Sequence, residues 1–588
     1  EDIGINSVNI ENKCLQFLND NYSKPLHSGR HILTEASNGS SDYGNKVGEA
    51  IIGGFVRTFT AEVYGDNEEY KRIYSFRKPI MFTAGIGTVL DGKEFKKELI
   101  NDNHDNHDNH DTNYLVVCQV GGPAYPIGMG GGSSSSVGQD DGDYQNAVQR
   151  GDPEMATRVV NFLRNFKDSD IILSIHDQGA GGCGNVVKEI LEPVGGDIDI
   201  GNIPLGNKDM SFLEIWCSEY QEQMTFIINN KDWDFVERIG KKENVPVYKV
   251  GVVNNTGIAK VSNSNLDSEM SPINLPLKDI LRTVPQKTLR IKERNFPISS
   301  SFKYESYNES KSSDLYNNLT NILLTPTVGS KKFLTNKVDR SVSGLIVQQQ
   351  CVGPLQLPLS NYSITAHTHS PTERYGTVSS IGEGSTAGFI PNKKGYSNLA
   401  YKVVMEMITN IMGANITGLS DIKCSANWMW SPKNDKYEAY SMYSAMKTLS
   451  DLCYQLGIAI DGGKDSVSMY SSLSKNKNDK TNDNTNDKTN DNTNDKLTIF
   501  SPPTLVLTGY VMTNDFNIRV TPDLKHMDST LIFIPLIEKW GSLGGSSYSH
   551  LINMDGKMND YSEQLDTNKI KSVFNIIQTL SKLSLISL

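Results

Sequence analysis

An internal repeat constrains the fold of this chain more than any other feature of its sequence. The segment KPIMFTAGIGTV at 78–89 resembles SPPTLVLTGYVM at 501–512, and both carry Thr and Gly near the end of an apolar run. Each is followed by a second apolar run and then by a small-residue loop, MGGGSSSS at 129–136 and LGGSSYS at 543–549. Because the two pairs are similarly spaced, we expect a duplicated unit of roughly four hundred residues.

Alternating apolar and amphipathic segments predict a mixed α/β or α+β chain. Apolar runs predict strands at 78–89, 114–120, 171–175, 223–228, 247–253, 345–350, 504–512 and 530–536. Amphipathic runs predict helices at 154–166, 396–412 and 437–456. Asp152 and Pro153 supply a cap and a first-turn proline for the first helix. The expected architecture is therefore mixed sheets with flanking helices.

Length and charge narrow the classes of function. A chain of 588 residues is long enough for several domains, and 37% hydrophobic with 21% charged residues excludes collagen-like and wholly disordered classes. A net charge of −11 argues against a protein that coats nucleic acid. No apolar run approaches the ~20 residues of a membrane span, and no signal segment opens the chain. We therefore expect neither nucleic acid nor a membrane as a partner.

Cysteine usage indicates a reducing compartment. The seven cysteines are scattered and contain no C-x-x-C pair, which is typical of neither a disulfide framework nor a zinc site. We expect a cytoplasmic protein whose cysteines are small buried hydrophobic side chains. Residue 1 is Glu rather than Met, so the chain need not begin where its gene does.

Two segments have low complexity. Residues 101–111 read NDNHDNHDNHD, and 475–496 are a run of Asn, Asp, Thr and Lys. Histidine at every third position of the first segment allows a metal site, but a solvated extended segment fixes no coordination geometry. Composition favours disordered insertions into a complete core.

Two glycine-rich segments could bind phosphate. VGGPAYPIGMGGGSSSSVG at 120–138 could converge backbone N–H groups on an anion, or it could be a flexible linker. SIHDQGAGGCGN at 174–185 places Asp177 at a strand end, where it could bind Mg²⁺ or cap the following helix. His176 beside it could be a base, a ligand or a packed hydrogen-bonded side chain. The residues alone leave these alternatives open.

The second half of the chain carries a further polar pair. Glu406 and Asn410 lie four residues apart in VVMEMITNIMG, which puts both oxygens on one helical face. They could share a hard cation, or they could form a polar stripe on an otherwise apolar helix. The strand–turn pieces SDIKCSANWMW at 420–430 and DGGKDSVSM at 461–469 follow.

These motifs, in this order, resemble those of phosphoribosylformylglycinamidine synthase in its large single-chain eukaryote-like form. The stretches that carry the resemblance are ASNGSSDYGNKVGE (36–49), VGGPAYPIGMGGGSSSSV (120–137), AVQRGDPEM (147–155), SIHDQGAGGCGNVVKE (174–189), EIWCSEYQE (214–222), FLTNKVDRSVSGLIVQQQCVGPLQLPL (333–359), EMITN (406–410), DIKCSANWMW (421–430), DGGKDSVSM (461–469) and TPDLKH (521–526). They extend from about residue 30 to 550 and are interrupted only by the insertions.

The resemblance implies an internally duplicated synthetase of the aminoimidazole ribonucleotide synthetase-like superfamily. Each half of such an enzyme contains two α/β domains. The expected divisions are 1–100, the tail of a first N-type domain; 101–111, an insert; 112–285, a first C-type domain; 286–314, a linker; 315–515, a second N-type domain with the insert 475–496; and 516–588, the start of a second C-type domain.

The resemblance also implies an activity. In this family ATP, with Mg²⁺, phosphorylates the amide oxygen of formylglycinamide ribonucleotide, and ammonia from glutamine then displaces phosphate to give the amidine. The family's H-N-H-P catalytic loop and its glutaminase domain are not found in this chain, and no catalytic residue is assigned. We expect the ammonia to come from a glutaminase domain outside the chain, and the isolated chain to be inactive.

The family's functional positions transfer to particular residues. The resemblance implies substrate contacts at Gln149, Glu219, Tyr220 and Gln221; nucleotide contacts at Gly53, Gly54, Phe55, Lys331, Ser360, Gly463 and Lys464; and Mg²⁺ ligands at Asp177, Asn361, Glu406 and Asn410. Asn361 stands where the family has Asp, and Pro126 where it usually has Arg. The alternatives are a non-catalytic nucleotide-binding remnant, or another ligase or kinase of the superfamily.

Overall fold

The computed structural model divides the chain into two compact units. Unit 1 comprises Glu1–Ala84, Gly138–Asp141 and Leu289–Leu588, and unit 2 comprises Gly85–Val137 and Gly142–Thr288. The structure describes residues 29–57, 60–64, 71–78, 83–95, 114–129, 138, 151–220, 222–266, 271–281, 285–293, 299–300, 315–325, 327–385, 393–433, 435–474, 496–526, 528–536, 547 and 565–586. Each unit is described by itself below.

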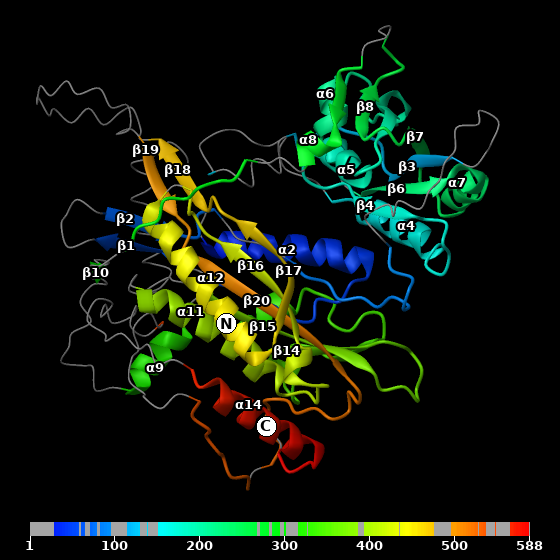
Figure 1. Cartoon of the computed structure of the whole chain (residues 1–588). Helices are drawn as coiled ribbons and strands as arrows, with labels where there is room; N and C mark the ends of the chain where they lie inside the picture. The colour runs from blue at the N-terminus through cyan, green and yellow to red at the C-terminus, as the bar shows by residue number, and fades with distance from the viewer. Residues whose placement is uncertain are drawn as a thin grey trace, which may run out of the picture. The chain divides into compact units, whose positions relative to one another are not determined.

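A six-stranded sheet forms the centre of unit 1 (Figure 1). Its order is β11 (Ile346–Gln348), β14 (Tyr362–Ala366), β15 (Gly376–Ser385), β20 (Thr504–Thr513), β16 (Lys423–Met429) and β17 (Ala459–Ser466). Only β16 and β17 run parallel, and the other neighbours are antiparallel. The central strand β20 is buried along nearly its whole length, as expected for a strand covered on both faces.

Helices α11 (Lys393–Ile411) and α12 (Lys436–Leu456) cover one face of this sheet, and α14 (Thr567–Lys582) packs against α12. Asp435 begins α12 by accepting hydrogen bonds from the backbone N–H groups of Tyr437 (2.6 Å) and Glu438 (3.0 Å), and Gly457 ends it with φ 81°. Among the described residues, the largest apolar core lies between these helices and the sheet.

Glycine lets α11 approach β15 closely. A Cβ atom at Gly382 would overlap the carbonyl oxygen of Val403 on α11 and would lie 2.9 Å from the backbone nitrogen of Met407. A Cβ atom at Gly384 would lie 2.6 Å from a methyl carbon of Leu399. Helix and strand backbones therefore touch here, and a side chain at Gly382 or Gly384 would push α11 away.

Smaller elements complete unit 1. A five-stranded sheet has the order β10 (Ser299–Ser300), β1 (Thr60–Tyr64), β2 (Lys71–Ser75), β19 (Lys496–Phe500) and β18 (Tyr470–Ser474), and a two-stranded sheet joins β12 (Cys351–Val352) to β13 (Leu357–Pro358). The remaining helices are α2 (Gly29–Val47), α9 (Leu315–Leu323), α10 (Lys332–Thr335) and the 3-10 turn η5 (Leu419–Asp421).

Unit 2 is a seven-stranded sheet with helices on both faces. The order is β4 (Ser174–Asp177), β6 (Gln223–Asn229), β3 (Leu115–Gly121), β7 (Val247–Val253), β5 (Gly196–Asp199), β8 (Ile258–Ser262) and β9 (Ile273–Pro276). Its helices are α4 (Pro153–Arg164), α5 (Gly182–Ile190), α6 (Phe212–Cys217), α7 (Trp233–Lys242) and α8 (Leu277–Leu281), with the 3-10 turns η2 (Ile200–Asn202) and η3 (Asn230–Asp232).

Alternate residues of β3 divide the core of unit 2 into two layers. Val116 and Cys118 pack with Phe162 of α4 on one face, while Val117 packs with Val187 of α5 on the other. Asp152 caps α4 through the backbone N–H of Met155 at 3.0 Å, which confirms the predicted helix start. Both faces of β3 are therefore buried.

The predicted α/β class is confirmed, but two predicted strands are wrong. Residues 530–536 are extended without strand pairing, and the side chains of Leu531 and Ile532 are 82% and 81% exposed. In 78–89, the described residues 78 and 83–89 form no strand. An apolar run becomes a strand only where a neighbouring strand offers hydrogen bonds, and the described residues show none beside either segment.

The two predicted inserts lie wholly or almost wholly outside the described residues. The insert 101–111 and residues 475–495 of the second insert lie outside them, and Lys496 already begins β19. All six cysteines in the described ranges are free, and all but Cys217 are buried. Within those same ranges, the structure has no helix that is long and apolar enough to cross a membrane.

We predict that Gly382→Ala destabilises unit 1 by about 1–3 kcal/mol, because the new methyl group forces α11 away from β15. Gly462→Ala on β17 is the matched control, since a Cβ atom there meets nothing within 4 Å. Urea unfolding followed by tryptophan fluorescence reports unit 1 through Trp428 and Trp430 once Trp216 and Trp233 of unit 2 are replaced by Phe. Equal unfolding midpoints for the two variants would contradict the close contact.

Candidate functional site

The segment 51–57 places Arg57 against the sheet of unit 1. Ile51 is held at both ends of its peptide: its N–H donates to the carbonyl of Asp339 at 2.8 Å, and its carbonyl accepts from Gln350 Nε2 at 3.0 Å. Phe55 packs against the small apolar cluster of Met429, Met469 and Val506. Arg57 then forms an ion pair with Glu383 of β15.

A second cation lies beside Arg57. Lys331 Nζ donates to the carbonyl of Thr327 at 3.2 Å, and Arg57 Nη1 reaches the same carbonyl at 3.5 Å. Burial, together with the charge of Arg57, lowers the pKa of Lys331 to about 8. Two half-buried cations that face one point lower the cost of placing a multiply charged anion there.

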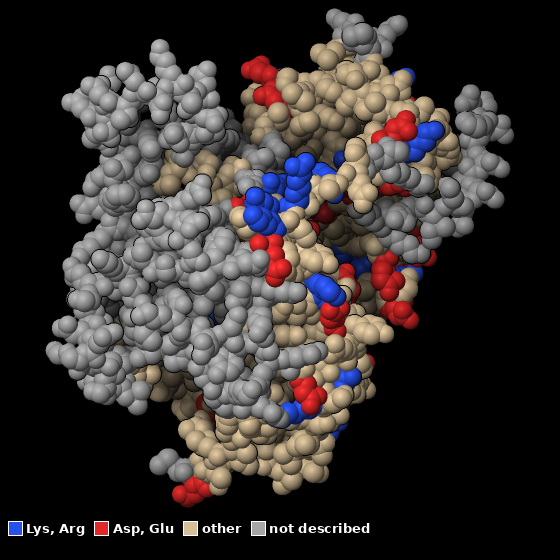
Figure 2. Space-filling view, turned by 60° about the vertical axis from the view of Figure 1, so that its left-hand side comes forward, with Lys and Arg blue, Asp and Glu red and all other residues tan. Residues whose placement is uncertain are grey.

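These two cations differ from those at the surface. On the face shown in Figure 2, Lys and Arg side chains lie interspersed with Asp and Glu. Such exposed charges are screened by solvent. Arg57 and Lys331 are partly shielded from solvent and are therefore better placed to recognise phosphate.

Glu406 and Asn410 of α11 form hydrogen bonds with the part of the β15 edge that does not pair with β14. Strand β14 begins at Tyr362 opposite Ser380, so β15 has an open edge beyond that pair. There the backbone N–H of Glu383 donates to Glu406 Oε2 at 2.9 Å, and Asn410 Nδ2 donates to the carbonyl of Ile381 at 3.0 Å. The predicted one-face placement of Glu406 and Asn410 is confirmed.

Two carboxylates meet at this edge. Burial, and secondarily the charge of Glu383, raises the pKa of Glu406, while the N–H of Glu383 opposes that shift. Glu383 is itself 3% exposed and is balanced by Arg57. A cation near Glu406 would offset both the burial and the repulsion.

The donor atoms fit Mg²⁺, which takes one or two carboxylates and completes its shell with water or phosphate oxygens. Glu406 keeps one carboxylate oxygen beyond its bond to Glu383, and Asn410 uses its amide NH₂ on Ile381 and keeps its oxygen. In the part of the chain that the structure describes, no three His, Cys, Asp or Glu side chains form a metal cluster. A cation here would therefore depend on nucleotide phosphates for further ligands.

Asn361 lies at the same edge. It precedes Tyr362, which pairs with Ser380, so continued register places Asn361 next to Ile381. It is exposed, whereas the adjacent Ser360 is buried and donates its hydroxyl to the carbonyl of Tyr362 at 3.0 Å. The Ser360 hydroxyl is therefore already hydrogen-bonded within the protein.

The predicted glycine positions belong to the segment 51–57 and to strand β17. Gly53 and Gly54 are exposed, and a Cβ atom at either would meet nothing within 4 Å. Gly463 and Lys464 lie on the edge strand β17. Because Lys464 pairs with Asn427, which pairs with Val506 and hence with Glu383, it lies three strands from Glu383, about 14 Å along the sheet.

In unit 2, Asp177 ends β4 with an exposed carboxylate. Helix α5 is capped by Gly181, so the alternative that Asp177 caps this helix is wrong. His176 contacts Glu189 through Nε2 at 2.9 Å and the carbonyl of Asp177 through Nδ1 at 2.7 Å. This matches the packed, hydrogen-bonded alternative for His176 and leaves Asp177 open to solvent.

Glu219 and Tyr220 point into the fold of unit 2. Both are 3% exposed. Glu219 Oε1 accepts the backbone N–H of Gly181 at 2.8 Å, and the hydroxyl of Tyr220 lies 3.6 Å from Cys183 Sγ. Burial raises the pKa of the Cys183 thiol, so it stays neutral inside this network. The contacts fix the turn after Asp177, while Gln149 and Gln221 lie outside the described residues.

Arg57 and Glu383 are functional candidates that sequence reasoning missed. Arg57 lies two residues after Phe55, and a cation so close to a predicted nucleotide segment was an available signal. Glu383 lies in VSSIGEGS, which has no motif spacing, and only the register of β15 and α11 brings it to Glu406. The sequence of β15 alone therefore gives no signal that Glu383 belongs to the site.

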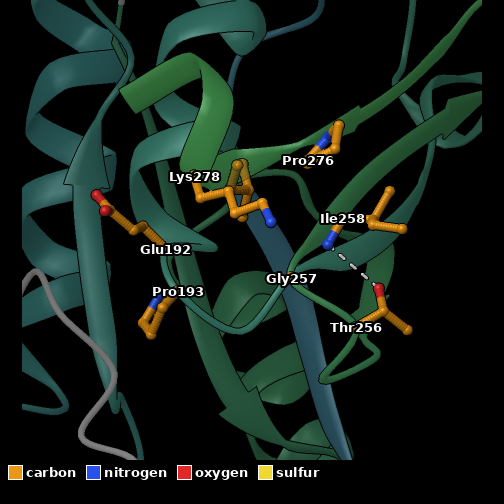
Figure 3. Close-up of a pocket in the computed structure, with 8 residues that line it drawn as sticks. Glu192, Pro193, Thr256, Gly257, Ile258, Pro276 and Lys278 are labelled. Carbon is orange, nitrogen blue, oxygen red and sulfur yellow. Dashed lines mark hydrogen bonds between the residues drawn. The ribbon is translucent and has the colours of Figure 1, made fainter. Parts of the chain in front are cut away.

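A separate cavity of about 360 Å³ lies in unit 2 (Figure 3). Pro193, Ile258 and Pro276 contribute apolar walls, and Lys278 and Glu192 contribute opposite charges. None of the predicted site residues lines it. We therefore locate the candidate site at the edge of β15 in unit 1.

Comparisons with family models divide the chain as the structure does. Residues 330–510 match the FGAR-AT PurM_N-like domain, which spans the six-stranded sheet of unit 1. Residues 115–262 match the C-terminal domain of AIR synthase related proteins, which spans most of the unit 2 sheet.

Curated relatives match nearly the whole chain. Phosphoribosylformylglycinamidine synthase of Dictyostelium discoideum is 37% identical over 99% of this chain and 41% of the relative. The synthase of Homo sapiens is 33% identical over 96% of this chain and 39% of the relative. The chain thus spans about two fifths of the length of the relatives it matches.

Solved structures share the fold at low identity. Thermotoga maritima PurL complexed with FGAR has a TM-score of 0.52 and 14% identity, covering 83% of this chain and 65% of that chain. The same protein complexed with AMPPCP has a TM-score of 0.50 and 14% identity, covering 83% and 64%. The chain therefore has the fold of the PurL synthetases and, as its motifs predict, resembles the synthetase region of phosphoribosylformylglycinamidine synthases.

Proposed function

We propose that this chain is the central part of a ligase that converts formylglycinamide ribonucleotide to formylglycinamidine ribonucleotide with ATP and glutamine-derived ammonia. The observation that carries the proposal is the ion pair of Arg57 with the buried Glu383, flanked by the half-buried Lys331 and Glu406. The relatives' name and the PurL complexes with FGAR and AMPPCP support it.

In this proposal Arg57 and Lys331 bind the phosphates of ATP, and Phe55 with Gly53 and Gly54 forms the adjoining wall. Glu406, Asn410 and Asn361 would hold Mg²⁺, which would neutralise phosphate charge when bound. Arg57 also forms an ion pair with Glu383 in its buried position. The chain's own contribution is therefore a prearranged set of charges into which a magnesium nucleotide fits.

The substrate side lies in unit 2. Gln149 and Gln221 are proposed substrate contacts, and Asp177 is a proposed ligand of a first-half Mg²⁺. Glu219 and Tyr220 contribute by fixing the turn after Asp177, since their polar atoms already bond to Gly181 and Cys183. Ammonia would come from a glutaminase domain, and six free cysteines among the described residues agree with a cytoplasmic setting.

Two departures from the family pattern favour the alternative of a non-catalytic nucleotide-binding remnant. Asn361 provides a neutral amide where the family resemblance implies a carboxylate, and Pro126 replaces a cation. A lost carboxylate weakens the binding of a hard cation. The two hypotheses differ in Mg²⁺ dependence, because a remnant that only binds nucleotide gains nothing from the cation.

We predict that Glu406→Gln raises the Mg²⁺ concentration needed for half-maximal AMPPCP binding by about tenfold or more, since even outer-shell partners of a metal contribute 10–100-fold. The amide oxygen still accepts from the N–H of Glu383, so this bond is kept while the charge and the second oxygen are lost. Calorimetric titration at several Mg²⁺ concentrations measures the shift. Asp451→Asn, an exposed carboxylate of α12, is the control, and an unchanged midpoint in Glu406→Gln would refute the assignment.

We predict that nucleotide affinity falls as pH rises from 7 to 9. The pKa of Lys331 is lowered to about 8, so its cation is present below this pH and is lost above it. Lys331→Met should weaken binding at pH 7 by about tenfold or more, because hydrogen bonds to charged groups contribute about 1.5–3 kcal/mol. It should also flatten the pH profile.

Lys332→Met, at the exposed neighbouring position, is the matched control for Lys331→Met. It should keep both the affinity and the pH profile of the unaltered chain. A Lys331→Met profile that still falls between pH 7 and 9 would assign the pH dependence to another group.

A further inference from the structure

Helix α14 packs against the end of the helix that carries the proposed metal ligands. Ile570 and Phe574 of α14 are buried in the unit 1 core at 0% and 2% exposure. One helical turn further on, Gln578 is also buried, at 7% exposure. A polar side chain at such a position needs hydrogen-bond partners inside the fold.

Gln578 finds all its partners in the turn that follows α11. Its Nε2 donates to the carbonyls of Met412 at 3.2 Å and Ala414 at 2.9 Å, and its Oε1 accepts from the N–H of Ile416 at 3.0 Å. Carbonyls just past a helix end lack partners within the helix, and Gln578 supplies them from about 165 residues away in sequence.

The same turn is tied to the strand that follows Asn361. Val520 N–H donates to the carbonyl of Gly413 at 2.7 Å, and the carbonyl of Val520 accepts the hydroxyl of Tyr362 at 2.6 Å. A Cβ atom at Gly413 would lie 2.5 Å from the ring of Tyr362, so turn and strand are in direct contact. The turn at 412–416 therefore joins α11, β14 and α14.

This junction lies within two helical turns of the proposed ligands on α11. Asn410 is the penultimate residue of α11, Glu406 is one turn before it, and Asn361 directly precedes Tyr362. A change in how the turn 412–416 is held therefore moves the end of α11 relative to β14. Glu406 and Asn410 lie on α11, and Asn361 directly precedes β14.

We propose that Gln578 is a positioning residue that fixes the end of α11, and with it the relative placement of Glu406, Asn410 and Asn361. This inference rests on the proposed function of these three residues as Mg²⁺ ligands. Gln578 contacts neither nucleotide nor cation and acts only through the turn 412–416. It makes α14 part of the nucleotide site of unit 1.

The test is the Mg²⁺ dependence of AMPPCP binding by the chain with Gln578→Leu. We expect the Mg²⁺ midpoint to rise about tenfold, the lower end of the range for outer-shell changes, while Mg²⁺-free affinity stays unchanged. Hydrogen exchange of the Ile416 amide should accelerate in parallel. Gln578→Glu, which keeps the acceptor and loses the donor, serves where Gln578→Leu fails to fold.

Phe574→Leu is the matched control, because it weakens the packing of α14 and leaves the amide contacts of Gln578 in place. A Mg²⁺ midpoint that stays unchanged in the Gln578 variants overturns the inference. Equal midpoint shifts in Gln578→Leu and in a Phe574→Leu variant of matched thermal stability also overturn it. Absence of Mg²⁺ dependence in the unaltered chain instead contradicts the proposed function itself, so the two failures are distinguishable.

Discussion

The close contact between α11 and β15 is the constraint on which the rest of the site depends. Glycine at 382 lets the helix backbone touch the strand, and this brings Glu406 and Asn410 to main-chain groups of Glu383 and Ile381. The two side chains thereby replace the hydrogen bonds that β14 would supply further along. Glu406 and Asn410 therefore complete the hydrogen bonding of the sheet edge and also carry the oxygen atoms proposed as metal ligands.

The contact between α11 and β15 also determines which charged side chains lie next to each other in unit 1. Burying Glu383 beside Glu406 would be costly without a counter-ion, and Arg57 supplies one from a segment about 330 residues earlier in the chain. Arg57 in turn helps burial lower the pKa of Lys331, and a bound anion would offset the repulsion between the two cations. A magnesium nucleotide would add both the anion and the cation that this arrangement accommodates.

Local patterns predicted the pieces of the site, and long-range register determined how they meet. The four-residue spacing of Glu406 and Asn410, and the Asp152 cap of α4, follow from helical geometry and are confirmed. Glu383 could not be predicted because its neighbours depend on strand pairing across distant segments. For the same reason the inward orientation of Glu219 and Tyr220, and the missing pairing of 530–536, were not visible in the sequence.

The most direct test of the account is a crystal structure of the chain with AMPPCP and Mn²⁺ in place of Mg²⁺. The account predicts an anomalous peak at coordination distance from Glu406 and Asn410, with the phosphates against Arg57 and Lys331. Nucleotide bound in unit 1 with no metal at Glu406, or phosphates bound away from Lys331, would contradict it.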